Sequence, residues 1–258
     1  AWKLIHNSII IGNIDLRLLL LNEGQLAAKL RNIGLSITVL DEHKLIFPLL
    51  LSRVHLFIKQ NNPQIIHSHR YKENILAYIG RGVKSKIALV ATQHGMPEGK
   101  ASRPLTASRL IADLNQYLLA NRFDRLVAVS KDIKNSFIQR GFESDRISVI
   151  YNGIEMPEEL ASRRKGPQIV VGSAGRLFPV KDYTLMTQVA QSALIKCNSI
   201  VFELAGEGPQ RSTLEALIYE FGIRKSFHLR GHLTDMDSFY ANLDIYLNTS
   251  VHEGIPMS

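Results

Sequence analysis

Apolar and polar residues along this chain follow two spacings that alternate. Short runs rich in Val, Ile and Leu indicate strands, and stretches with an apolar residue every three or four positions indicate helices. In the first half we predict strands at 15–21, 35–40, 65–66, 87–92, 125–129 and 147–150. The helices predicted between them are 26–33, 45–59, 72–83, 105–121 and 132–140.

The second half repeats this alternation. Its predicted strands are 169–174, 199–205, 226–230 and 244–247, and its predicted helices are 182–195, 210–221 and 235–242. Strands that alternate with helices of this length form parallel sheets with right-handed crossovers. We therefore predict an α/β fold of two Rossmann-like domains that face each other across a cleft, with a ligand at the C-terminal ends of the strands.

A polar segment at 154–167 separates the halves and reads as an interdomain linker, so the domains are expected at 1–153 and 168–258. Both domains look incomplete. Residues 2–13 show no opening strand with a glycine-rich turn, and the chain stops at Ser258, where a loop should become a helix. We expect a fragment cut at both ends.

Composition narrows the class of protein. The chain has 258 residues, 45% of them hydrophobic, and no apolar run reaches the length that spans a bilayer. Cys197 is the only cysteine, which excludes an intrachain disulfide and favours a reducing, cytoplasmic compartment. These features predict a soluble globular protein.

The charge is uneven between the halves. Residues 1–165 hold 24 Lys and Arg against 14 Asp and Glu, whereas residues 166–258 hold 7 against 9. An anionic acceptor or an acidic membrane surface is therefore expected to meet the N-terminal half. No basic run with interleaved aromatic residues accompanies this charge, so no nucleic-acid partner is predicted.

The stretch 169–182 carries the most informative chemistry. A β-branched run indicates a buried strand, and the small residues up to Gly175 allow a tight turn. Arg176 and Lys181 then place two cations on one short loop, which is a suitable receptor for a diphosphate. The alternative is a loop with two solvated cations.

Several motifs occur in order along the chain. They are GRLFPVKD (175–182), ELAGEGPQRSTLE (203–215), FHLRGHLTDM (227–236) and DIYLNTSVHEGIPMS (244–258), preceded by LLLLNEG (18–24), IIHSHRYKENILA (65–77), TQHG (92–95), DRLVAVSKDIKNSF (124–137) and VIYNGIE (149–155). Together they resemble the retaining, GT-B-fold glycosyltransferases of family 4, the glycosyl transferases group 1. The resemblance covers nearly the whole chain.

The resemblance implies a nucleotide-sugar donor site in the second half. Arg176 and Lys181 would hold the donor's pyrophosphate, and Glu253 would contact the transferred sugar. Glu253 alone could instead be a solvated loop acid. Backbone amides of a helix N-terminus would face the phosphates, contributed by Gly254, Ile255 and Met257.

Other donor-side residues follow from the same resemblance. Gly206 and Gly208 would border the nucleotide, although a GxG on its own is equally a tight turn. His232 stands at a strand end where family members bind the nucleobase of the donor. The alternative is a histidine exposed on the surface without this role. By the same resemblance, the second glutamate of the family motif would fall beyond Ser258.

Histidines mark the first half. His94 ends a predicted buried strand, and the resemblance implies a catalytic role near the donor sugar and acceptor; the alternative is a core histidine bonded to backbone. His67 and His69 form an H-x-H pair that could bind zinc, but no third ligand with suitable spacing accompanies them. A structural or acceptor-lining role is expected, with no metal and no cofactor.

The resemblance thus implies an enzyme of cell-surface polysaccharide biosynthesis that transfers a sugar from a UDP-sugar, with retention, to a glycan or lipid-linked acceptor. It would act in the cytoplasm or at the inner face of the membrane. No Ser-His-Asp order, P-loop or hydrolase-type pair of carboxylates appears. The alternatives are an epimerase or phosphorylase on the same fold, or a non-catalytic protein that binds nucleotide sugars.

Overall fold

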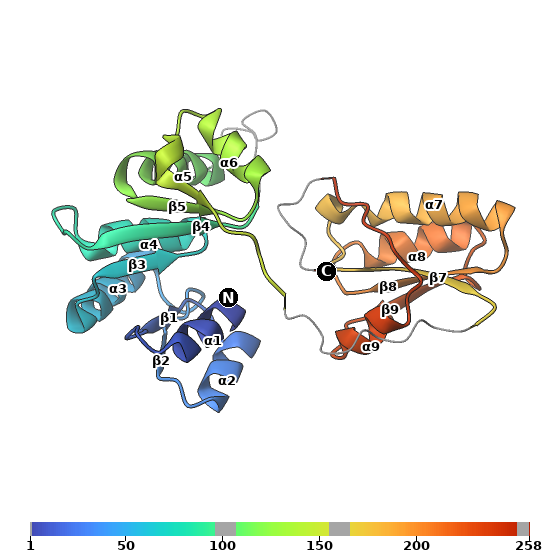
Figure 1. Ribbon diagram of the computed structural model, residues 1–258, viewed down its shortest axis with the longest axis horizontal. Helices are drawn as coiled ribbons and strands as arrows, with labels where there is room; N and C mark the ends of the chain where they lie inside the picture. Colours follow the sequence, from blue (N-terminus) through green and yellow to red (C-terminus); the bar gives the residue numbers. More distant parts are fainter. Residues whose placement is uncertain (1, 96–106, 155–165, 252–257) are drawn as a thin grey trace. The chain divides into compact units, whose positions relative to one another are not determined.

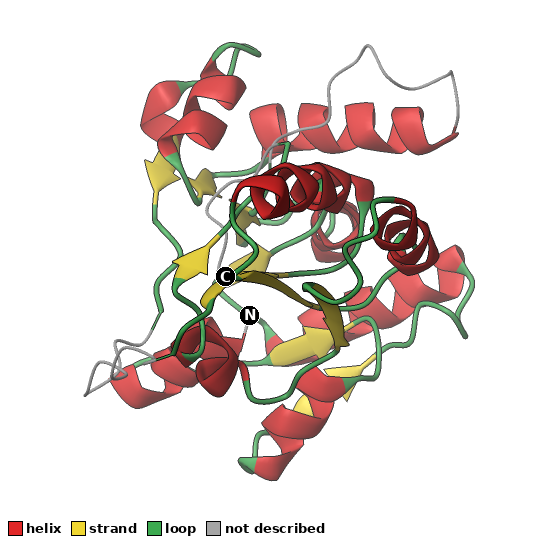
Figure 2. Cartoon of the chain, turned by 90° about the vertical axis from the view of Figure 1, so that its right-hand side faces the viewer, coloured by secondary structure: helices red, strands yellow, loops and turns green. Residues whose placement is uncertain are grey.

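The computed structural model describes residues 2–95, 107–154, 166–251 and 258. The chain divides into two compact units, 1–150 and 151–258 (Figure 1). All strand pairs described are parallel, and the helices lie outside the strands (Figure 2). The predicted α/β fold with parallel sheets is therefore confirmed.

The N-terminal unit holds two sheets. The first pairs β1 (Leu18–Leu20) with β2 (Ile37–Val39), and the second has the order β3-β4-β5-β6. The strands of the second sheet are β3 (Ile65–Ser68), β4 (Ala88–Gln93), β5 (Arg125–Ala128) and β6 (Ile147–Val149). A Rossmann-like domain has its strands in one sheet. In this structure β1 and β2 pair only with each other, apart from the four-stranded sheet.

The helices of this unit fall close to their predicted ranges. They are α2 (Gln25–Asn32), α3 (Phe47–Asn61), α4 (Tyr71–Arg81), α5 (Ala107–Arg122) and α6 (Lys131–Ile138), with a 3₁₀ turn, η2, at Ser144–Arg146. A further helix, α1 (Trp2–Ile11), lies where the sequence pattern predicted no element.

Local sequence explains two helix ends. The Ser130 hydroxyl accepts a hydrogen bond from the backbone N–H of Ile133 over 3.2 Å, so Ser130 caps α6. Asn62 ends α3 in the left-handed conformation, with φ of 40°, which asparagine tolerates better than most residues.

Two apolar clusters hold the N-terminal unit together. One packs α4, α5 and α6 onto β4, β5 and β6, with Leu89, Phe123 and Ile133 almost completely buried. The other packs α3 and α4 against the region of β1 and β3, around Leu21, Val54 and others. These clusters fix the strand ends that carry the histidines.

The C-terminal unit is a four-stranded sheet of order β10-β7-β8-β9. Its strands are β7 (Ile169–Ala174), β8 (Ile200–Ala205), β9 (Phe227–Gly231) and β10 (Ile245–Tyr246). The connecting helices are α7 (Tyr183–Lys196), α8 (Arg211–Glu220) and α9 (Met236–Ala241). A short 3₁₀ helix, η3 (Pro179–Lys181), precedes α7.

Each face of this sheet has its own core. Val171, Phe202 and Leu204 belong to the cluster that also includes residues of α7 and α8. Ala174 and Ala205 pack with Phe239 of α9 in a smaller cluster. The sheet is thus covered on both faces, as expected for parallel strands linked by right-handed crossovers.

The predicted linker lies largely outside the described residues, which resume at Gly166. The unit boundary falls between Ile150 and Tyr151. Among the helices that the structure describes, none has both the length and the apolar character required to cross a membrane.

Candidate donor site and histidine cluster

Three candidate residues lie together at one edge of the C-terminal sheet. Gly175, Gly206 and His232 directly follow β7, β8 and β9, whose parallel strands end on the same side. Backbone hydrogen bonds join these ends: the Gly175 N–H donates to Ala205 over 2.9 Å, and the Gly206 N–H donates to Gly231 over 2.7 Å. Open α/β sheets bind ligands at this edge.

The loops after β7 and β8 are in direct backbone contact. A Cβ atom at Gly206 would lie 1.9 Å from the carbonyl oxygen of Gly175, and one at Gly208 would lie 2.6 Å from that of Leu177. Gly206 also has φ of +140°, which side chains rarely adopt. These two positions therefore need glycine so that the loops after β7 and β8 can pack against each other, and their place beside a nucleotide stays a prediction.

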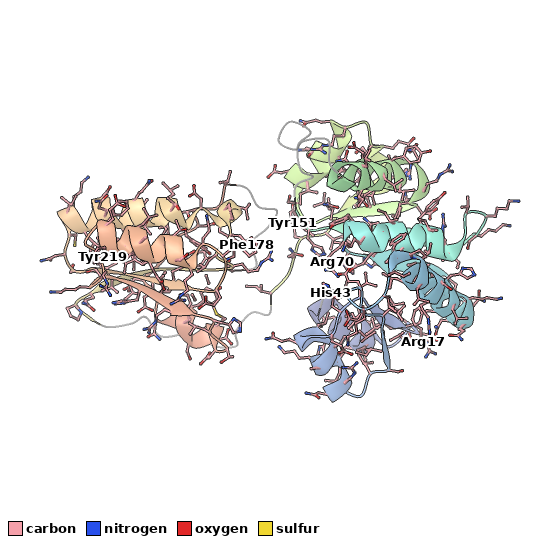
Figure 3. The ribbon with its side chains drawn as sticks, turned by 180° about the vertical axis from the view of Figure 1, so that it is seen from behind. Arg17, His43, Arg70, Tyr151, Phe178 and Tyr219 are labelled. Carbon is pink, nitrogen blue, oxygen red and sulfur yellow. The ribbon has the colours of Figure 1, made fainter. Side chains whose placement is uncertain are left out.

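Arg176 extends from this edge into solvent. Its guanidinium carbon lies 4.9 Å from the centroid of the Phe178 ring, so the exposed cation is held by a cation–π contact. Figure 3 shows Phe178 at one end of the C-terminal unit and Tyr219, on α8, towards the other. The guanidinium is thus presented at the carboxyl end of the strands.

Lys181 closes the loop and folds back toward its start. An ideal Cβ on Gly175 would lie 3.3 Å from the Lys181 Cε and 3.7 Å from its Nζ, so the amine lies close over the end of β7. The next residue, Asp182, has φ of 45° and accepts a hydrogen bond from the Leu185 N–H over 3.2 Å, which caps α7. The sharp turn at Asp182 directs the chain from η3 into α7.

Two features of this edge were missed by sequence reasoning. Tyr183 is almost fully buried, and its hydroxyl oxygen would lie 2.7 Å from a Cβ at Gly175. The tyrosine side chain therefore packs directly against the turn that follows β7. Glu207 pairs with Arg211 over 2.5 Å, and Arg211 pairs with Glu215 over 2.9 Å. The i, i+4 spacing of these charges was the available signal.

The N-terminal unit gathers three histidines at the ends of β3 and β4. Nδ1 of His69 lies 3.1 Å from Nε2 of His94, and Nε2 of His67 lies 2.8 Å from the Thr92 hydroxyl. The ring centroids of His67 and His69 are 4.5 Å apart, and those of His69 and His94 are 5.4 Å apart. The structure therefore joins His94 to the H-x-H pair.

All three rings favour the neutral state. Burial and the neighbouring imidazoles lower the pKa of His69 to about 4. Burial also lowers the pKa of His94 and that of His67. At neutral pH one ring nitrogen of the His69–His94 pair donates and the other accepts, and a neutral imidazole suits a sugar hydroxyl better than a phosphate.

A buried polar chain supports this cluster. The Ser68 hydroxyl donates to the Asn74 side chain over 2.6 Å, and the Asn74 amide donates to Asn115 over 2.8 Å. Glu73 accepts the backbone N–H groups of His69 and Arg70, each over 3.1 Å, at the start of α4. The chain therefore enters α4 in a fixed direction just after His69.

The remaining candidates stay predictions. Glu253, Gly254, Ile255 and Met257 lie outside the described residues, and the roles of His94 and His232 depend on ligands. Within the described ranges no group of His, Cys, Asp and Glu side chains has the geometry to hold a metal ion, the histidine cluster included.

Two parallel α/β units in one chain are the architecture of the GT-B class of glycosyltransferases. Residues 14–156 match the family model Glycosyltransferase Family 4, and residues 156–258 match Glycosyl transferases group 1. The chain therefore belongs to glycosyltransferase family 4.

Two relatives of the chain are named for the transfer of different sugars. The chain is 23% identical over 224 residues to the UDP-Gal:alpha-D-GlcNAc-diphosphoundecaprenol alpha-1,3-galactosyltransferase of Escherichia coli, covering 81% of this chain and 57% of that protein. It is 27% identical over 206 residues to a subunit of the phosphatidylinositol N-acetylglucosaminyltransferase of Saccharomyces cerevisiae, covering 74% and 44%. The chain thus spans about half the length of these relatives.

Solved structures share the fold. Anabaena HepE, in complex with UDP-glucose, superposes with a TM-score of 0.73 at 18% identity, covering 90% of this chain and 65% of that one. Staphylococcus aureus TarM superposes with a TM-score of 0.65 at 15% identity, covering 80% and 41%.

Proposed function

We propose that this chain forms the acceptor-side and donor-side parts of a glycosyltransferase that moves a sugar from a UDP-sugar to a glycan or lipid-linked acceptor, with retention of anomeric configuration. The observation that carries the proposal is the loop of residues 175–182 at the carboxyl end of β7, which we name the cation loop. In it Arg176 stacks on Phe178 and Lys181 folds back over Gly175.

The chemistry follows from where charge develops. When the bond between the sugar and the diphosphate breaks, negative charge accumulates on the leaving phosphate oxygens. Fixed cations at that point stabilise the transition state more than the ground state, and this difference lowers the activation barrier. Arg176 can hold a phosphate with a two-pronged hydrogen bond, and Lys181 adds a point charge.

Retention would follow from attack on the same face as departure. The acceptor oxygen bonds to the anomeric carbon as the diphosphate leaves, and the acceptor proton passes to a leaving phosphate oxygen. This route needs no protein nucleophile and no metal. His94, neutral and paired with His69, would hold a hydroxyl of the sugar or acceptor.

The acceptor class draws support from two sides. The Escherichia coli and yeast relatives are named for a diphosphoundecaprenol-linked and a phosphatidylinositol acceptor. The excess of Lys and Arg in residues 1–165 suits an anionic acceptor of that kind. Such an acceptor would place the reaction at the inner face of a membrane.

The test is sugar transfer with a panel of UDP-sugars and polyprenyl diphosphate-linked acceptors. Mass spectrometry would identify the product, and NMR of its anomeric proton would report retention. We expect UDP release to match glycoside formation. An isomerised UDP-sugar, or a free sugar phosphate, as the main product would overturn the proposal.

A further inference from the structure

The segment after β10 fastens the cation loop to the sheet. The Thr249 hydroxyl donates to the backbone carbonyl of Lys181 over 3.0 Å. Two residues later the Val251 N–H donates to the carbonyl of Val180, also over 3.0 Å. These bonds connect residues about 70 positions apart in sequence, and neither Thr249 nor Val251 was a candidate site residue in the sequence analysis.

The hydrogen bond from Thr249 acts at a strained point. The Lys181 carbonyl belongs to the peptide group that joins Lys181 to Asp182, whose φ of 45° lies in the left-handed region. Such a conformation is strained for a residue other than glycine and persists only where surrounding contacts determine it. A hydroxyl on that carbonyl fixes the plane of the peptide group, and with it the backbone of Lys181.

The opposite half of the loop is held by backbone groups alone in the bonds described. The Leu177 N–H donates to the Glu207 carbonyl over 3.0 Å, and the Gln210 N–H donates to the Leu177 carbonyl over 3.1 Å. The hydroxyl of Thr249 is a side-chain contact, so it can be removed by substitution while the backbone contacts stay in place.

We propose that Thr249 is a positioning residue of the donor site. Its hydroxyl holds the Lys181–Asp182 peptide group so that the Lys181 amine stays over Gly175, where it meets the donor diphosphate. This inference rests on the proposed function, because it takes Lys181 as a phosphate ligand.

The first experiment measures UDP binding to the protein by calorimetry for Thr249→Val and Thr249→Ser. The loss of one hydrogen bond predicts about fivefold weaker binding for the valine variant. Serine keeps the hydroxyl and should restore most of the affinity. Thr213→Val is the matched control, because Thr213 is exposed on α8. Urea unfolding of each variant shows that it is folded, and Thr249→Ala replaces valine if that variant is not.

A double-mutant cycle with Lys181→Met separates positioning from general stabilisation. If Thr249 acts through Lys181, the double variant binds UDP no more weakly than Lys181→Met alone. Full additivity of the two losses would overturn the inference. Normal binding by Thr249→Val with weak binding by Lys181→Met would also overturn it, and would leave the proposed function standing. Normal binding by Lys181→Met would overturn both.

Discussion

Gly206→Ala should disable the proposed donor site, because the added methyl group would collide with the backbone of the neighbouring loop. The new Cβ would lie 1.9 Å from the Gly175 carbonyl oxygen. Because carbon–oxygen contacts begin at about 3.3 Å, the loops after β7 and β8 would have to separate by about 1.4 Å. The strained φ of +140° and the overpacking together predict a loss of about 2–6 kcal/mol in the free energy of unfolding.

Activity should fall as well, because Gly175 directly precedes Arg176. A displacement of about 1 Å at a reacting centre costs on the order of 100-fold in rate, so kcat/KM for UDP-sugar should drop by about that factor. Gly222→Ala is the control: Gly222 has φ of +67° in the same unit, and a Cβ there meets nothing within 4 Å.

Urea unfolding and a UDP-release assay measure the two quantities on the same preparations. The control should lose stability through backbone strain and keep its activity once folded. Equal losses in both variants would refute the reasoning, since contact between the loops would then play no part in positioning the cations.

Three further results are expected. Arg176→Ala or Lys181→Ala should lower kcat by about 100- to 1000-fold in the same assay, as for single donors to a developing oxyanion; full activity in both variants would remove the cation loop from the mechanism. His69, with its pKa lowered to about 4 in the folded chain, binds fewer protons than in the unfolded chain below its ordinary value of 6.5. Stability should therefore decline as the pH falls from about 6.5 to 4, and His69→Asn should reduce that slope in urea unfolding measured across the range. Asn74→Ala should cost about 1–3 kcal/mol in the same unfolding measurement, because it leaves the buried Ser68 and Asn115 groups without this partner; a neutral result would mean that water replaces the amide.

The order of elements could be read from the sequence because most of the parallel strands contain a short run of β-branched or other apolar residues, such as residues 169–171 in β7. The strand predicted at 169–174 is found at Ile169–Ala174. The N-terminal end could not be read in this way. Helix α1 is apolar on most sides and exposes Ile10 and Ile11, so its periodicity was too weak to predict a helix.

The candidate site was predictable in part. Glycines and cations after a buried strand pointed to Gly175, Arg176 and Lys181 because local sequence encodes that turn. The contact of Gly206 with Gly175, and that of Thr249 with Lys181, join loops from different strands. Such contacts depend on strand order and register, which no local pattern contains.

The pair Asn74–Asn115 has a practical consequence for redesign. Two amides that must meet inside an apolar layer allow α5 one rotation and one height against α4. A redesign of this half should therefore keep both amides, because changing either one frees α5 to shift against α4.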